Sequence, residues 1–257
     1  MRAIWSGAIS FGLVNIPVKI YSAVSRAKLD LDMLDPKNMA HIRYKRVNEK
    51  TGKEVPWNNI VKGYKLEDEY IILEDEDFEK ASPEKSEAID IQEFTDLEEI
   101  DSVLYKRPYY IEPQKGGKKA YQLLVKALKK TGKVGVATFI LRKTESLSII
   151  RERDGMLILQ RLRFAEEIRD TEELKLPKNV KVKKAELEMA ESLIDSYSVD
   201  FKPEKYKEQY NKALMKIIKA KAKGKTPKVR KLKREPTESS DLLKQLKASL
   251  DKGKKAS

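Results

Sequence analysis

The side chains that most readily suggest chemistry in this 257-residue chain are carboxylates between residues 66 and 101, where sixteen Asp or Glu stand against two Lys. Asp75 and Asp77 lie two residues apart in this block. Such carboxylates can hold the divalent cation of a metal-dependent nuclease. No histidine, asparagine or glycine pattern frames a pair of them, however, and runs of charge are usually solvated surfaces. We favour the solvated surface and keep the nuclease as an alternative.

Other catalytic patterns are weak or absent. The single histidine, His41, begins a strand-like run and has no nucleophile motif near it. There is no cysteine, which excludes disulfides and thiolate metal sites. The Gly116-Gly117-Lys118-Lys119 stretch lacks the spacing of a phosphate-binding loop, although paired glycines before a helix can bind phosphate weakly through backbone N–H groups. We therefore predict a protein that is not an enzyme and uses no metal or cofactor.

The basic residues carry the stronger signal. The chain has a net charge of +13, and its segments differ sharply: residues 1–65 carry +7, 66–101 carry −14, 102–165 carry +11, 166–218 carry −1 and 219–257 carry +10. Segregated charge creates one face that attracts anions and another that repels them. The distribution predicts a polyanionic partner.

Predicted strands carry many of these charges. Residues 4–24 are predicted to form two strands broken at Gly12. Pro17 predicts an edge strand or a bulge, because proline has no backbone N–H to donate to a neighbouring strand. Residues 102–163 read as a strand, an amphipathic helix stopped by Gly132, a β-branched run, and two strands joined at Asp154-Gly155, a dipeptide typical of tight hairpins. This stretch predicts the folded centre of a mainly β protein.

A projecting arm is predicted over residues 41–64. Residues 41–47 alternate as a strand, residues 48–53 read as a hairpin tip, and few apolar residues line the return path. We expect short strands at 30–34 and 70–73, the latter buried, a helix at 74–81 and a strand at 88–94. The arm is basic and too polar to be central core.

The C-terminal part is predicted to be helical and then disordered. Two helices, at 187–197 and from Pro203 to about 217, each carry one apolar stripe that must pack on the β domain or on a second subunit. Residues 219–234 hold nine positive charges and should be disordered when free. A last amphipathic helix at about 240–252 suits a partner's groove, or else folds back on its own domain.

No part of the sequence predicts export or membrane insertion. Its first residues lack the apolar run of a secretory signal, and no run approaches the ~20 apolar residues of a membrane helix. We expect a cytoplasmic, nucleoid-associated protein with no membrane partner.

Several of these stretches resemble the bacterial Ku proteins. The resemblance lies in residues 2–18 (RAIWSGAISFGLVNIPV), 43–47 (RYKRV), 60–64 (IVKGY) and the strand–helix–strand of 109–141, and it extends over about residues 1–218. Some members of that family place a cysteine pair near 48–52, where this chain has Asn48-Glu49-Lys50-Thr51-Gly52. No metal is expected there.

The resemblance implies an α+β, mainly β fold. Residues 1–182 would form a Ku-like β-barrel core whose arm, about 41–64, interlocks with a second copy in a dimeric ring around DNA. Residues 183–218 would be a helical C-terminal arm and residues 219–257 a lysine-rich flexible tail. The implied function is sequence-independent binding of double-stranded DNA ends in non-homologous end joining by a homodimer that recruits and stimulates an ATP-dependent DNA ligase.

The charge distribution and the family resemblance together suggest candidate contact residues. Each of these residues could also be an ordinary solubilising side chain. The predicted DNA contacts are Arg43, Lys45, Arg46, Lys50, Lys53, Lys62, Lys106, Arg107, Arg142, Lys143, Lys221, Lys223, Lys225, Lys228, Arg230 and Lys231. The predicted ligase-docking residues are Leu242, Leu243, Leu246 and Leu250.

A second hypothesis remains open, in which the chain is a general RNA- or single-strand-binding β-barrel. Such a protein needs exposed aromatic side chains on which bases stack. The candidates for that role are Trp5, Trp57, Tyr105, Tyr109 and Tyr110.

Overall fold

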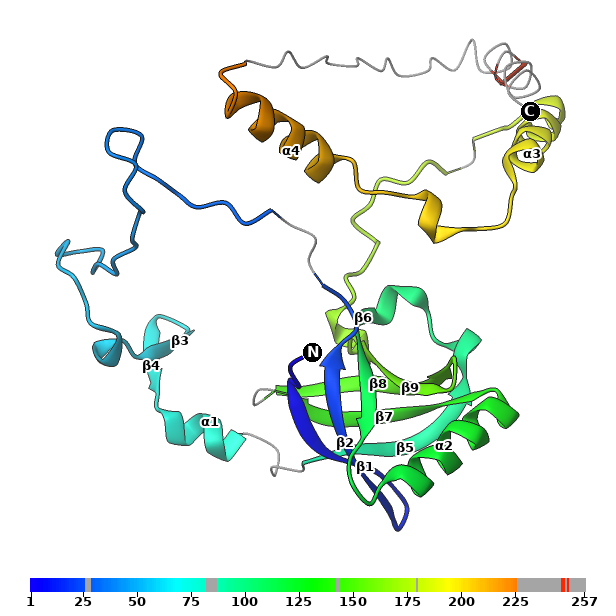
Figure 1. Ribbon diagram of the computed structural model, residues 1–257, viewed down its shortest axis with the longest axis horizontal. Helices are drawn as coiled ribbons and strands as arrows, with labels where there is room; N and C mark the ends of the chain where they lie inside the picture. The colour runs from blue at the N-terminus through cyan, green and yellow to red at the C-terminus, as the bar shows by residue number, and fades with distance from the viewer. Residues whose placement is uncertain are drawn as a thin grey trace. The chain divides into compact units, whose positions relative to one another are not determined.

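A computed structural model describes residues 1–25, 29–81, 87–141, 144–178 and 180–225, together with residues 246, 247 and 249 (Figure 1). The described chain divides into two units, with the boundary between Asp170 and Thr171. The first unit holds every strand of the described chain, and the second holds its helices α3 and α4.

Seven strands of the first unit form a closed barrel, which confirms the mainly β fold class. In the barrel their order is β1-β2-β6-β9-β8-β7-β5. Each neighbouring pair is antiparallel except β1 and β5, which pair in parallel and close the barrel. The strands are β1 (Trp5–Phe11), β2 (Val14–Ser22), β5 (Ala88–Asp96), β6 (Tyr105–Pro113), β7 (Lys133–Leu141), β8 (Thr144–Arg153) and β9 (Met156–Leu162).

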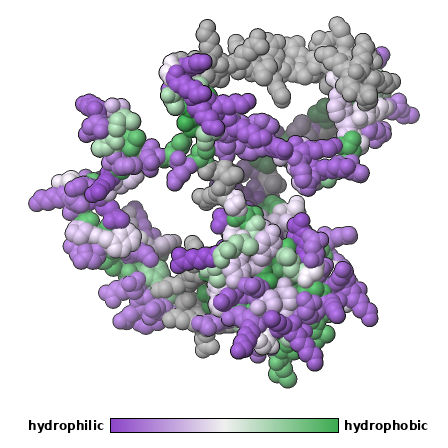
Figure 2. Space-filling model, viewed as in Figure 1, coloured by the Kyte–Doolittle hydropathy of each residue, from purple (hydrophilic) through white to green (hydrophobic). Residues whose placement is uncertain are grey.

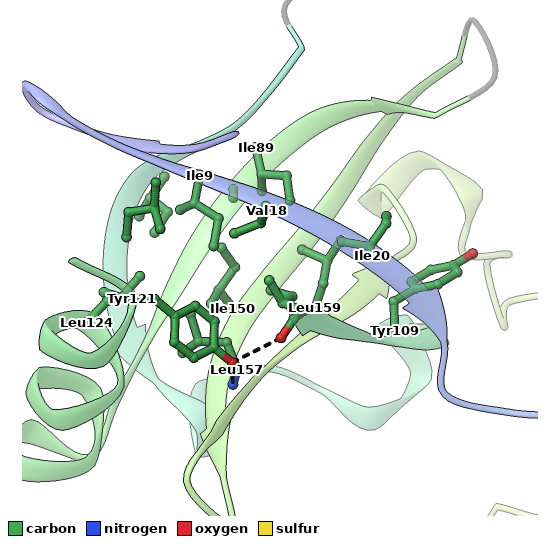
Figure 3. Close-up of a cluster of buried hydrophobic side chains, with 14 of the residues drawn as sticks. Ile9, Val18, Ile20, Ile89, Tyr109, Tyr121, Leu124, Ile150, Leu157 and Leu159 are labelled. Atoms are coloured by element: carbon green, nitrogen blue, oxygen red, sulfur yellow. Dashed lines mark hydrogen bonds between the residues drawn. The ribbon is translucent and has the colours of Figure 1, made fainter. Parts of the chain in front are cut away.

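Inward-facing side chains fill the barrel. Ile16, Val18 and Ile20 of β2 alternate with exposed or half-buried neighbours and are fully buried, as the alternating pattern of residues 14–20 predicts. Figure 3 shows the residues of this core, among them Ile9, Ile89 and Leu159. A smaller cluster around Ile149 lies on β7, β8 and β9. The barrel therefore has a core of its own.

Helix α2 (Lys118–Thr131) packs against this core through one face. The Tyr121 hydroxyl donates to the Ile111 carbonyl at 3.0 Å and accepts from the Leu157 N–H at 2.8 Å (Figure 3). Burial raises the pKa of Tyr121 above its usual value. Gly132 ends the helix with φ 71°, as expected for a left-handed C-terminal residue.

Two predicted turn features are confirmed, and one prediction is wrong. Gly12 has φ 55°, and Asp154 and Gly155 have φ 52° and 81°, as their turns require. Pro17, however, belongs to a strand with neighbours on both sides. It lies one residue beyond the last β2–β6 pair, at Val18, and its carbonyl accepts from Gln114 N–H at 2.8 Å. Its ring therefore replaces an N–H that faces the end of that ladder, and no edge strand is needed.

The segment 29–81, which we call the arm segment, is much less regular than predicted. It contains the 3₁₀ turn η1 (Trp57–Asn59), the hairpin strands β3 (Lys62–Leu66) and β4 (Glu69–Leu73), and the helix α1 (Asp75–Ala81). The predicted strands at 30–34 and 41–47 reduce to two isolated bridges, Leu34 to His41 and Val47 to Glu54. The strand at 70–73 forms but is not buried. Alternation predicted strands here, but among the described residues no adjacent strand extends the two bridges and no apolar layer covers them.

Short 3₁₀ turns and two helices complete the described chain. The turns are η2 (Leu97–Glu99), η3 (Ser102–Leu104), η4 (Ala165–Glu167) and η5 (Pro203–Lys205), and the helices are α3 (Lys184–Tyr197) and α4 (Tyr210–Lys221). The helix predicted from Pro203 begins seven residues later, because Pro203 opens η5 instead. Neither α3 nor α4 has a buried residue. Within the described ranges, no helix has the length and apolarity to cross a membrane.

Candidate nucleic-acid interface

The tip of the arm segment is a tight hairpin, as predicted for residues 48–53. The Asn48 N–H donates to the Lys53 carbonyl at 2.9 Å, and the Gly52 N–H donates to the Asn48 carbonyl at 2.8 Å. The Asn48 side-chain oxygen also accepts from the N–H groups of Lys50 and Thr51, both at 3.0 Å. Asparagine commonly organises turns in this way. The tip therefore holds Lys50 and Lys53 on an ordered loop.

Three predicted contact residues of the arm segment have defined partners within it. The Lys45 ammonium lies 2.6 Å from a Glu54 carboxylate oxygen. The Arg46 guanidinium lies over the Trp57 ring, 4.4 Å from its centroid, and the Lys62 ammonium lies 4.3 Å from the centroid of Phe78. Cations over aromatic faces are attracted by the ring quadrupole. These contacts fix the direction of two positive groups while leaving their outer sides in water.

The arm segment has no core. None of its residues is buried, and its exposed fractions include 79% at Tyr44, 71% at Trp57 and 58% at Ile72. Figure 2 shows hydrophobic and hydrophilic side chains together on the segment that runs from β2 to α1. The arm segment therefore exposes many apolar side chains that no core of its own covers.

The predicted contacts on the barrel are not equally available. Arg107 is exposed, but the Lys106 ammonium lies 2.6 and 2.8 Å from the two carboxylate oxygens of Glu167. The hydrogen bond from Lys106, followed by one from the Phe164 N–H, holds the pKa of Glu167 below its usual value. Arg163 donates from Nη1 to the carbonyls of Val103 and Tyr105 at 2.7 and 2.8 Å. This region is therefore a structural clasp for the start of β6.

The remaining predicted sites lie at or beyond the limits of the described chain. Arg142, Lys143, Lys228, Arg230 and Lys231, and the leucines at 242, 243 and 250, lie outside the described residues. Lys221 ends α4, while Lys223 and Lys225 follow it, and all three are exposed. Leu246 is helical and half-buried. The DNA-binding and ligase-docking assignments stay predictions.

The aromatic residues proposed for base stacking do not form one exposed surface. Tyr109 is buried in the barrel core, and Trp5 packs edge-on against Phe139 with ring centroids 6.1 Å apart. Tyr105 packs on the smaller core cluster. Only Trp57 and Tyr110 of the five are exposed, and Trp57 already has Arg46 over one face. Most of these aromatics therefore stabilise the fold.

The acidic block contributes to local structure. An Asp77 carboxylate oxygen accepts from the Glu74 N–H at 2.9 Å at the start of α1, where acidic side chains favour the helix dipole. Lys133 pairs with Asp96 at 2.6 Å. In the ranges that the structure describes, no three side chains of the metal-binding types converge on a common point.

Sequence patterns alone miss two features of this interface. The partner of Lys106 lies 61 residues away, and the pairing of β6 with β9, which η4 follows, brings the two side chains together. The stack of Arg46 on Trp57 spans the hairpin tip, and the expected pairing of 41–47 with the return path is the one signal that could have indicated it. Both features depend on contacts that residue spacing does not record.

Comparisons with known proteins place this architecture in a family. The family profile described as the Ku70/Ku80 beta-barrel domain matches residues 10–189. The chain belongs to the Ku family. The non-homologous end joining protein Ku of Coxiella burnetii is 40% identical over 99% of this chain and 96% of its own length. The proteins of the same name from Opitutus terrae and Archaeoglobus fulgidus are 37% and 42% identical, over 98% and 87% of this chain and 92% and 89% of their own.

Proposed function

We propose that this Ku-family chain binds the ends of double-stranded DNA in non-homologous end joining, as a homodimer and without catalysing a reaction itself. The observation that carries the proposal is the identity of about 40% with proteins named for that process, over nearly the whole chain. The charge distribution agrees with it, since sequence-independent binding relies on Lys and Arg at phosphates and needs no recognition helix.

The arm segment supports the homodimer. A two-stranded hairpin such as β3–β4 is marginally stable alone, and both of its faces are exposed in one chain. A second copy supplies an identical apolar surface, which would cover exposed side chains such as Tyr64, Tyr70 and Ile72. Two arms joined in this way would close a ring, and a ring can load only at a DNA end.

The test of end binding compares linear and circular duplexes. The protein is loaded on a linear duplex, both ends are then blocked with bulky groups, and retention in moderate salt is measured against a relaxed circle of the same length. We expect the blocked line to retain protein that the circle does not capture. Equal affinity for line and circle, abolished alike in moderate salt, would refute end binding.

A tail function is proposed separately. Its lysines and arginines from 219 to 234 would contact DNA, and the leucines of the terminal helix would dock an ATP-dependent DNA ligase. Changing Leu242 and Leu246 to Glu should leave DNA binding intact and abolish ligase stimulation, whereas changing Lys221, Lys223 and Lys225 to Gln should weaken binding to every DNA sequence. Unimpaired ligase stimulation by the leucine variant would refute the docking role.

A further inference from the structure

Helix α2 presents an unusual surface on the barrel. Its inner face places Tyr121, Leu124, Val125 and Leu128 in or against the core, with 3–5% of each exposed, and Figure 3 shows Tyr121 and Leu124 pointing into the barrel. Its outer face carries five lysines and no acidic residue. These exposed lysines are Lys118, Lys119, Lys126, Lys129 and Lys130.

The five lysines form one stripe. At 3.6 residues per turn they fall within about 120° of one another, on the exposed side of the helix. None of the five makes an ion pair with a carboxylate among the residues that the structure describes. The stripe is about 18 Å long at 1.5 Å per residue, and duplex DNA carries about ten phosphates over that length.

Helix stability does not account for this arrangement. Lys129 and Lys130 in the last turn suit the helix dipole, but Lys118 and Lys119 in the first turn oppose it. Like charges four residues apart, such as Lys126 and Lys130, also destabilise a helix. Helix α3 has the same length of 14 residues and shows the ordinary solvated pattern, with Lys184 facing Glu188 at 3.7 Å. The lysine face of α2 is therefore a feature that folding alone would not select.

The positive surface continues onto the barrel strands at the C-terminal end of α2. Lys129 lines a hollow of about 170 Å³ with Lys133 of β7 and Arg151 of β8. The one carboxylate lining this hollow, Glu152, accepts from the Gly155 N–H at 2.7 Å, and Lys133 is paired with Asp96. Neither Lys129 nor Arg151 forms an ion pair with a carboxylate in the described part of the chain.

We propose that the lysine face of α2 binds the phosphates of duplex DNA, as a contact surface on the barrel separate from the arm segment. The inference rests on the proposed function for its ligand. Charge complementarity selects a polyanion, and the only aromatic residue of the helix, Tyr121, is buried, so α2 offers no platform for single-stranded bases. Packing on the core fixes the helix backbone that carries the lysines before DNA arrives, which limits the entropy that binding costs.

The test replaces four lysines of the stripe, Lys118, Lys119, Lys126 and Lys130, with Gln in the full chain. Glutamine is a good helix former, and circular dichroism with a thermal melt checks that the fold is unchanged. The matched control changes four exposed lysines of the second unit, Lys175, Lys178, Lys181 and Lys202, to Gln and so removes the same charge. Affinity for a linear duplex is measured at several salt concentrations.

We expect the α2 variant to bind at least about tenfold more weakly. The slope of log affinity against log salt should fall by about 0.9 for each phosphate that the variant no longer neutralises, up to about 3.6. The control should keep a slope close to that of the wild type. An α2 variant with the wild-type slope, or a control with an equal loss, would overturn the inference. Comparing retention on linear and circular duplex is a separate measurement. A wild type that shows no preference for ends refutes the proposed function, but the salt dependence of the α2 variant can still be interpreted.

Discussion

The barrel and the arm segment contain similar apolar side chains and use them in opposite ways. In the barrel, Ile20, Ile150 and Leu159 are fully buried and packed in one cluster. In the arm segment, Val61, Ile71 and Ile72 are 64%, 46% and 58% exposed. The difference shows that an alternating apolar pattern specifies a strand face without specifying what covers it. The barrel covers its own face, while a second copy would cover that of the arm segment under the proposed function.

The largest expected difference concerns stability. Leu159→Ala should lower the barrel's free energy of unfolding by about 2–5 kcal/mol, because it leaves a cavity in a closed core. Ile72→Ala should change it by no more than about 0.5 kcal/mol at concentrations where the chain is monomeric. Urea unfolding of both variants tests this. Equal losses at high dilution would mean that the arm segment is part of the barrel's cooperative unit.

The next effect probes the bond that fastens α2 to the barrel. Tyr121→Phe removes a hydroxyl that bonds both the Ile111 carbonyl and the Leu157 N–H. Two buried backbone groups then lack a partner, and the free energy of unfolding should fall by about 1–3 kcal/mol. Tyr44→Phe, at an exposed tyrosine of the arm segment, is the control and should change little. A neutral Tyr121→Phe would show that water replaces the hydroxyl.

A smaller effect is expected in the arm segment, where order comes from pairs rather than from a core. Trp57→Ala removes the ring beneath Arg46 and should weaken duplex binding about two- to fivefold, since an exposed cation–π contact contributes about 0.5–1 kcal/mol. Trp57→Phe should recover part of the loss. Fluorescence titration with a short duplex measures all three proteins. An alanine variant as tight as wild type would exclude a positioning role for Trp57.

The smallest effect is a pH dependence at the clasp of β6. The folded-state pKa of Glu167 is lowered by Lys106, so the stability that this carboxylate contributes is present above its unfolded-state pKa and is lost as pH falls through the lowered one. Glu167→Gln should therefore melt slightly below wild type at pH 7. The two should converge at acid pH. A difference in melting temperature that persists below the pKa range of carboxyl groups would mean that Glu167 stabilises the fold by packing and not by its charge.

Local patterns predict much of the barrel and little of the arm segment. Alternation in residues 14–20, the Asp154-Gly155 hairpin and the helix stop at Gly132 are short-range signals, and each is present in the structure. Closure by a parallel β1–β5 pair is not readable from the sequence, because those strands are about 80 residues apart. In the arm segment the same alternation predicted a strand at 41–47 where only bridges form.

The candidate contacts divide in the same way. The charge distribution identifies the basic segments but not which lysines are already paired with a carboxylate. Lys106 forms a salt bridge with the distant Glu167, and Lys45 forms one with Glu54. Residue spacing assigns α2 to the scaffold because of its apolar stripe, and its lysine face becomes distinct only when the opposite face is packed against the core. Availability of a charge depends on its neighbours in space.

Whether the arm segment pairs with a second copy can be measured together with end binding on one sample. Light scattering gives the mass of the wild type and of Ile72→Glu, and the same samples are then assayed for retention on end-blocked linear duplex. We predict a wild type of twice the chain mass that is retained, and a variant of single mass, with an unchanged barrel melt, that is not. A monomeric wild type that is still retained after end blocking would show that DNA binding needs no second copy.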